Sequence, residues 1–194
     1  MRFSFLRNIH RSVIAIGLVS FFTDLSSEMI YPYLPLFLTA VLGAGALALG
    51  LIEGVAEMTA SVIKIVSGNM TDRAARRKPF VLAGYGLSSL MRPLIGLAQT
   101  WPLVLVLRFM DRVGKGIRTS PRDALIADVT EPRFFGQAYG FHRAMDHAGA
   151  VVGPLIAAFL LKGLGVPLRQ VFLFSAIPAV MVLIILIAFV REKQ

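Results

Sequence analysis

Residues Gly68 to Pro79 read Gly-Asn-Met-Thr-Asp-Arg-Ala-Ala-Arg-Arg-Lys-Pro. The stretch holds four cationic side chains and one acid, Asp72, and long apolar segments flank it on both sides. Because so many charges cannot lie in hydrocarbon, the stretch is expected to form a short loop at a membrane surface. Loops rich in Lys and Arg stay on the cytoplasmic side, so the stretch also orients the chain. A plain stop-transfer loop would carry the same charge, but the acid ahead of the cluster favours a more specific role.

The composition supports a membrane protein. Of 194 residues, 56% are hydrophobic, and the mean hydropathy of +0.73 is far above that of a soluble domain. The net charge of +9 would suit a nucleic-acid partner. However, the basic residues fall mostly in the gaps between apolar runs, so no nucleic-acid partner is expected. Cysteine is absent, which excludes disulfides, thiol catalysis and cysteine metal sites.

The apolar runs predict an all-α membrane protein, with residues 1–194 forming a single bundle of six transmembrane helices. A spanning helix needs about 20 mostly apolar residues. The expected spans lie near Ser12–Leu42, Ala46–Ser67, Phe80–Ala98, Pro102–Ala127, Gln137–Leu161 and Val171–Val190. Pro32 and Pro35 are expected to bend the first span. The fourth span is the least regular, because charged residues follow its apolar first half.

The chain begins with a basic segment and an apolar run, which imitates a secretory signal peptide. No small-residue cleavage site follows and Asp24 comes next, so a retained first helix is expected. The alternation of basic and uncharged connections places both termini in the cytoplasm. The expected location is therefore a bacterial inner (plasma) membrane.

Two charged stripes lie inside the predicted membrane segments. Asp24 and Glu28 share one face of the first helix, and Arg108 and Arg112 share one face of the fourth. A charge at a helix centre costs about 2.5–3.5 kcal/mol on insertion scales, so each needs a partner or a water-filled cavity. The stripes are expected to neutralise each other. Two interpretations remain open: a cavity for protons or substrate, or static salt bridges that only hold helices together.

The second helix carries another acidic pair, Glu53 and Glu57, four residues apart. Two like charges at this spacing repel, so they need a cation elsewhere or a bound proton. Arg92 in the third helix is one candidate partner.

The fifth helix contains His142 and Asp146 at a ligand-like spacing. A metal site needs more ligands than these, so no metal site is expected. Further along, Gly149 and Gly153 lie four apart, and such small residues let helices approach closely.

Several of these segments resemble the signature motifs of the major facilitator superfamily. The motif between its second and third helices is matched at Gly68, Asp72, Arg73, Arg76, Arg77 and Lys78, whereas Ala75 replaces its second glycine. Arg108–Gly116 resembles the fourth-helix motif in part, with Arg112 at a usual glycine. Gly149–Pro154 resembles the fifth-helix Gly-x-x-x-Gly-Pro motif. The paired prolines of the first helix also have counterparts here.

The resemblance implies the amino-terminal half of a twelve-helix transporter. It implies a proton and substrate cavity lined by Asp24, Glu28, Arg108 and Arg112, and a cytoplasmic gating loop at the first motif. It further implies a surface that meets the second half, with Glu53, Glu57, Gly149, Gly153 and Pro154. The fifth-helix motif is associated with antiporters, which suggests efflux of a small organic compound against proton entry.

The resemblance therefore implies a transporter rather than an enzyme, with no cofactor and a proton gradient as its energy source. The expected partners are the lipid bilayer, a small-molecule substrate and a second six-helix half, either a separate chain or a parallel copy. Two alternatives remain: a non-transporting membrane interaction subunit, or a truncated fragment of a full-length transporter. An intramembrane hydrolase is not favoured, since no convincing pair of nucleophile and base is present.

Overall fold

The computed structural model describes residues 9–72 and 76–190, and all regular structure in these ranges is helical. The helical segments are α1 (Arg11–Glu28), η2 (Tyr31–Tyr33), α2 (Leu34–Leu36), η3 (Phe37–Val41), α3 (Ala46–Asp72), α4 (Lys78–Leu94), η4 (Ile95–Leu97), α5 (Trp101–Asp128), η5 (Pro132–Phe134), α6 (Phe135–Ala158), η6 (Phe159–Gly163), α7 (Leu168–Phe174) and α8 (Ala176–Phe189). The predicted all-α fold class is confirmed.

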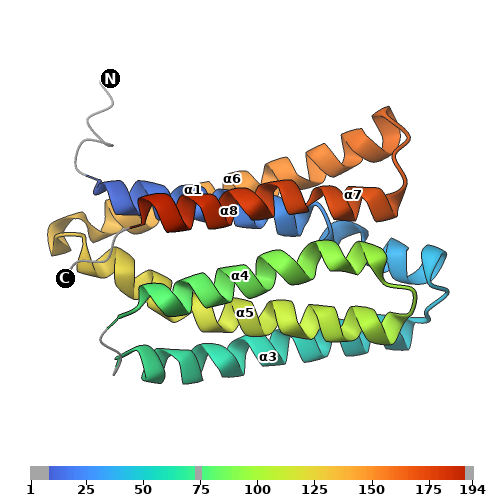
Figure 1. Ribbon diagram of the computed structural model, residues 1–194, viewed down its shortest axis with the longest axis horizontal. Helices are drawn as coiled ribbons and strands as arrows, with labels where there is room; N and C mark the ends of the chain where they lie inside the picture. Colours follow the sequence, from blue (N-terminus) through green and yellow to red (C-terminus); the bar gives the residue numbers. More distant parts are fainter. Residues whose placement is uncertain (1–8, 73–75, 191–194) are drawn as a thin grey trace.

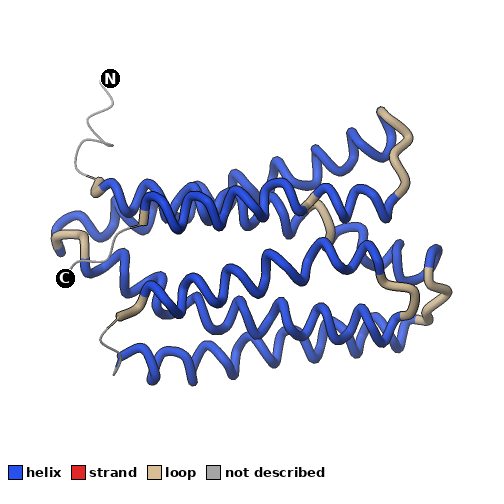
Figure 2. Tube along the Cα trace, viewed as in Figure 1, coloured by secondary structure: helices blue, strands red, loops and turns tan. Residues whose placement is uncertain are grey.

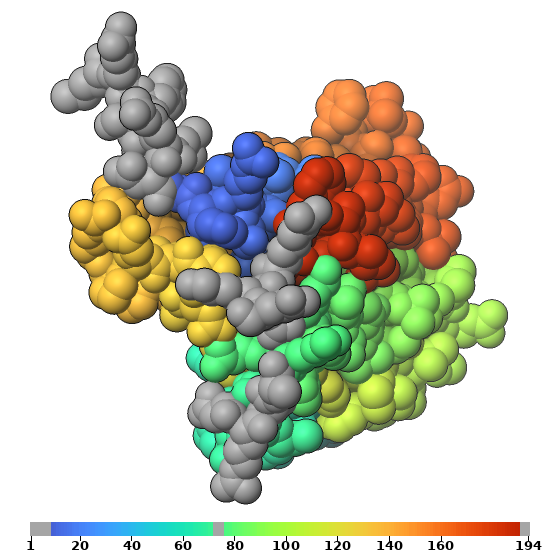
Figure 3. Space-filling model, turned by 60° about the vertical axis from the view of Figure 1, so that its left-hand side comes forward, coloured from blue at the N-terminus to red at the C-terminus, as the bar shows by residue number. Residues whose placement is uncertain are grey.

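The long helices form a bundle of two groups (Figure 1). In one group α1 packs against α6 and α8; in the other α5 packs between α3 and α4, and α4 also contacts α8. Short connections alternate between the two ends of the bundle (Figure 2). Figure 3 shows one end, where the start of α1, the end of α8 and the connection between α5 and α6 lie close together.

Five helical segments among the described residues are long and apolar enough to cross a membrane. They match the predicted spans except the fourth, because the charges of α5 lower its hydropathy. α5 is nevertheless a continuous helix of 28 residues that packs along both α3 and α4. We infer that it crosses the membrane with its neighbours.

The predicted loop at Gly68–Pro79 is too long. α3 continues through Gly68 to Asp72, and α4 already begins at Lys78. A Gly or an Asn destabilises a helix by no more than about 1 kcal/mol relative to Ala. The helix can therefore continue through such residues after it leaves the hydrocarbon. The connection that carries the basic cluster is therefore only a few residues long.

The bend predicted at Pro32 and Pro35 is confirmed as a break. α1 ends at Glu28, and the chain then continues through short 3₁₀, α and π turns to Val41. Pro32 lacks a backbone N–H and clashes with the preceding turn, which prevents one regular helix through this region. The break turns Tyr31 toward the bundle interior, where it meets α5.

Glycines allow the closest approach between helices. A Cβ atom at Gly149 would lie 2.2 Å from the carbonyl oxygen of Phe21, and one at Gly153 would lie 2.7 Å from that of Leu25. Both glycines are thus used to pack α6 against α1 within this bundle. The prediction that Gly149 and Gly153 meet a second half is wrong, because α1 already occupies that face of α6.

Candidate functional site: the charged face of four helices

A fully buried carboxylate, Asp111, lies at the centre of the bundle. Its oxygens accept hydrogen bonds from Arg92 Nε at 2.9 Å and from the Tyr31 hydroxyl at 2.5 Å. Arg108 and Arg112 approach the same carboxylate at 3.5 and 3.7 Å. We call these five residues the Asp111 cluster; it joins α4, α5 and the break after α1.

Arg108 extends the Asp111 cluster to α3. Its Nη2 donates to both carboxylate oxygens of Glu53, at 3.1 and 3.3 Å. Its guanidinium group also lies 3.6 Å from the centre of the Tyr31 ring, a cation–π contact. Two of its buried nitrogens, Nε and Nη1, make no hydrogen bond. Arg108 is therefore held in place by Asp111, Glu53 and Tyr31.

The predicted pairing of Asp24 and Glu28 with Arg108 and Arg112 is wrong. Among the described residues, neither acid forms an ion pair or accepts a side-chain hydrogen bond. Asp111 and Glu53 neutralise the arginines instead, because both lie nearer to them on the packed helices. Asp24 and Glu28 remain half-buried carboxylates without a direct cationic partner in the described structure.

A second polar region lies beside Asp24, toward the end of the bundle where α3 ends and α6 begins. It is a cavity of ≈ 330 Å³ between α1, α3, α5 and α6, which we call the polar pocket. Its lining consists of Asp24, Glu57, Ala60, Ser61, Lys64, Lys115, Arg118, Thr119, Arg122, Arg143 and Asp146. The charged lining distinguishes this cavity from the apolar ones.

His142 and Asp146 are held by other protein groups. The Nε2 atom of His142 lies 2.7 Å from the Ser20 hydroxyl on α1, and Nδ1 lies 3.7 Å from Asp146. Asp146 also contacts Arg143 at 3.4 Å. No group of three or more potential metal ligands occurs in the described ranges. His142 therefore links α6 to α1, whereas the ion-pair contacts of Asp146 are with His142 and Arg143 of its own helix, at the edge of the polar pocket.

The basic cluster is described only in part. Arg76 is exposed, Arg77 forms an ion pair with Asp128 at the end of α5, and Lys78 donates to the carbonyl of Ile187 on α8. Gly68 lies in α3 next to Ser120 of α5. The Asp72 side chain and Arg73 lie outside the described residues. The gating role of this loop stays a prediction.

Of the residues predicted to meet a second half, some are accessible at the surface of the bundle and the two glycines are buried. Glu57 is exposed and Pro154 is half-buried, whereas Glu53 is exposed on one side but already bonded to Arg108. The glycines are buried, as described above. Apart from these charged positions, α3, α6 and the start of η6 expose apolar residues, namely Leu47, Leu51, Met58, Val62, Ile65, Val151, Leu155 and Phe159.

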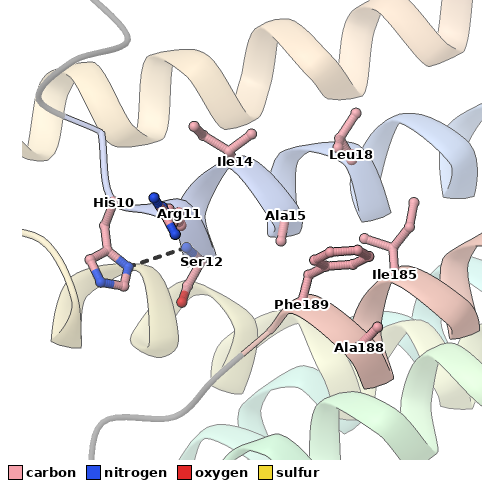
Figure 4. A pocket seen from close by; sticks show the side chains of 9 residues that line it. All are labelled: His10, Arg11, Ser12, Ile14, Ala15, Leu18, Ile185, Ala188 and Phe189. Atoms are coloured by element: carbon pink, nitrogen blue, oxygen red, sulfur yellow. Dashed lines mark hydrogen bonds between the residues drawn. The ribbon is translucent and has the colours of Figure 1, made fainter.

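A larger hollow, of ≈ 740 Å³, lies between the start of α1 and the end of α8 (Figure 4). Most of its labelled side chains are apolar, including Ile14, Leu18 and Phe189, while Arg11 and His10 lie at its edge. Because it contains no acid and is remote from the Asp111 cluster, we do not assign it a role in transport.

Sequence reasoning missed Asp111, the central residue of the site, and the pocket residues Arg118 and Arg122. One signal was present: Asp111 lies three residues after Arg108, a spacing at which two side chains meet on one helix face. Arg92, a candidate partner for Glu53 or Glu57 from the sequence, pairs with Asp111.

Comparison with known proteins identifies the family. The family model of the Major Facilitator Superfamily matches residues 16–194. The chain belongs to this superfamily. It is 37% identical over 187 residues to the uncharacterized MFS-type transporter MJ1317 of Methanocaldococcus jannaschii, covering 96% of this chain and 46% of the relative. It is 30% identical over 135 residues to the multidrug resistance protein MdtH of Photorhabdus laumondii, covering 69% of this chain and 33% of that protein.

The fold has a counterpart among solved structures. A bacterial homologue of the human lysosomal transporter Spinster, in an inward-facing and unoccupied conformation, superposes with a TM-score of 0.78 at 20% identity. The match covers 94% of this chain and 43% of the transporter. This major facilitator chain thus spans less than half the length of the relatives it matches.

Proposed function

We propose that the protein forms one half of a proton-coupled transporter that exports a small organic compound. The observation that carries the proposal is the charged face formed by α1, α3, α5 and α6 on a bundle whose remaining surface is largely apolar. Ionisable groups within membrane segments are costly and mark substrate or proton paths. The similarity to a multidrug resistance protein supports export as the direction.

Asp24 is the best candidate for the proton-binding group. It lines the polar pocket and is half-buried, yet it has no direct cationic partner among the described residues. A carboxylate in this situation can take up and release a proton without breaking a salt bridge. Asp111 cannot do so readily, since Arg92 and Tyr31 already occupy its oxygens. Glu28, one turn from Asp24, is the second candidate.

Transport by this mechanism requires a second six-helix bundle. Alternating access in this superfamily is a rocking of two bundles around a shared central site. The open apolar surfaces of α3 and α6 flank the charged face, so they are the surfaces a second bundle would cover. The second bundle can be a separate segment or a parallel copy of this chain. We further propose a bacterial plasma membrane with both termini in the cytoplasm, where the basic connections lie.

The experiment is transport by the protein together with its second half in proteoliposomes with an imposed pH gradient. Asp24→Asn is expected to lower proton-driven substrate movement at least tenfold and to leave gradient-independent exchange intact, because only the proton step is removed. The matched control is Lys162→Gln, an exposed change at the opposite end of the bundle. Unchanged proton coupling in both Asp24→Asn and Glu28→Gln would contradict the proposal.

A further inference from the structure

We propose that the polar pocket binds the negatively charged group of the transported compound, so that the substrate is an organic anion. The inference deepens the proposed function and rests on it only in placing the pocket on the transport path. Every residue that lines the pocket in this structure comes from α1, α3, α5 and α6.

The lining carries an excess of positive charge. Five cationic and three acidic side chains face the cavity. Two of the cations are engaged: Arg122 bonds to Asp123 at 2.8 Å, and Arg143 contacts Asp146 at 3.4 Å. The other three, Lys64, Lys115 and Arg118, have no acid within 4.0 Å among the described residues. They outnumber the two unpaired acids of the pocket.

Arg118 gives the pocket its specific character. The residue is only 4% exposed, yet none of its nitrogens donates a hydrogen bond within the described structure, and its Nε is fully enclosed. Its guanidinium lies 4.1 Å from the centre of the Tyr85 ring, a cation–π contact that uses none of its hydrogen-bond donors. Burying an unpaired guanidinium is costly unless an anion or water completes its hydrogen bonds. A ligand with oxygen acceptors would supply them.

The two acids in the pocket do not cancel this preference. Asp24 comes from α1 and Glu57 from α3, on helices that flank the basic residues of α5. Neither carboxylate lies within 4.0 Å of a nitrogen of Lys115 or Arg118, so these acids and cations do not form ion pairs with each other. A bound anion would contact the α5 cations in the same cavity as Asp24, the proton-binding residue of the proposed function.

The cavity in this bundle has room for at least the anionic part of a small ligand. A volume of ≈ 330 Å³ lies at the small end of the range for small-molecule sites, roughly 300–1,000 Å³. This fits a compound with one phosphate, sulfonate or carboxylate group and a small organic body. The anionic group can belong to a water-soluble compound or to a lipid headgroup, and the experiment distinguishes these sources.

The test measures binding by calorimetry to the full chain in nanodiscs of phosphatidylcholine, without any gradient. The probes share one ring and differ in charge: phenyl phosphate, benzyl alcohol and phenyltrimethylammonium. Phenyl phosphate is expected to bind, and the neutral and cationic probes are not. A second set of nanodiscs contains phosphatidylglycerol; weaker phenyl phosphate binding there indicates that a lipid headgroup competes for the pocket, and unchanged binding indicates a soluble anion.

Lys64→Gln and Lys115→Gln each remove one exposed pocket cation and are expected to weaken phenyl phosphate binding about tenfold or more, since each removes a charge-assisted contact with the anion. Lys162→Gln should leave the affinity unchanged. Arg118→Gln should abolish binding, and the two lysine variants cover the case in which it does not fold. Preference for the cationic probe, no phenyl phosphate binding, or wild-type affinity in both lysine variants would overturn the proposal, even if Asp24-dependent transport is observed.

Discussion

At the scale of single residues, one carboxylate organises three arginines. Asp111 is fully buried and contacts Arg92, Arg108 and Arg112 within 4.0 Å. Forming such a cluster gives little net stability, because desolvation offsets the attraction between the charges. Removing the Asp111 carboxylate is expected to cost much more stability, because the three arginines would then lie close together without its negative charge between them.

Asp111→Asn is therefore expected to destabilise the bundle by about 3–5 kcal/mol, the usual cost of breaking a buried charge pair. The measurement is chemical or thermal unfolding in detergent. The matched control is Glu131→Gln, which breaks an ion pair whose side chains are 65–72% exposed and should change stability by less than about 1 kcal/mol. Similar losses in both variants would mean that Asp111 does not organise the cluster.

At the scale of helices, the packing of α6 against α1 depends on the absence of a side chain. The backbone of α1 approaches so closely that a Cβ at Gly149 would overlap the Phe21 carbonyl. Gly140 lies on the same helix but has no atom within 4 Å of the corresponding position. The same substitution at these two sites thus separates steric packing from helix propensity.

Gly149→Ala is expected to destabilise the protein by about 1–3 kcal/mol, the cost of overpacking, whereas Gly140→Ala should be neutral or stabilise it by up to about 1 kcal/mol. Both are measured by thermal unfolding under identical detergent conditions. If Gly149→Ala leaves the stability unchanged, α6 does not pack against α1 through this face. Gly149 would then lie on the surface of the bundle.

The sequence predicts the helices better than their pairing. Apolar length places the spans, and the prolines of the first span locate its break, since both are local properties. Two of the three partners of Arg108 are not local, because Glu53 comes from α3 and Tyr31 from the break after α1. The Gly149–Gly153 spacing indicates close packing but not which helix provides it. Such choices depend on the bundle as a whole.

At the scale of the whole molecule, the bundle has different surfaces for water and lipid. The polar pocket brings charged groups of four helices to one side. α8 lies on another side and exposes large apolar residues, including Ile177, Ile184 and Ile187. In a membrane, a transport path requires that water reaches the side with the polar pocket and that lipid covers the side with α8. This asymmetry is the central claim about function.

Thiol labelling in membranes tests that claim most directly, because the chain has no native cysteine and a single introduced one is the only reactive group. Ser61→Cys places a thiol in the polar pocket, and Ile184→Cys places one on the apolar side of α8. A membrane-impermeant reagent is expected to label the first rapidly and the second not at all, while a lipid-soluble reagent labels both. Equal reactivity of both positions toward the impermeant reagent, or an unreactive Ser61→Cys, would contradict a water-filled path along this face.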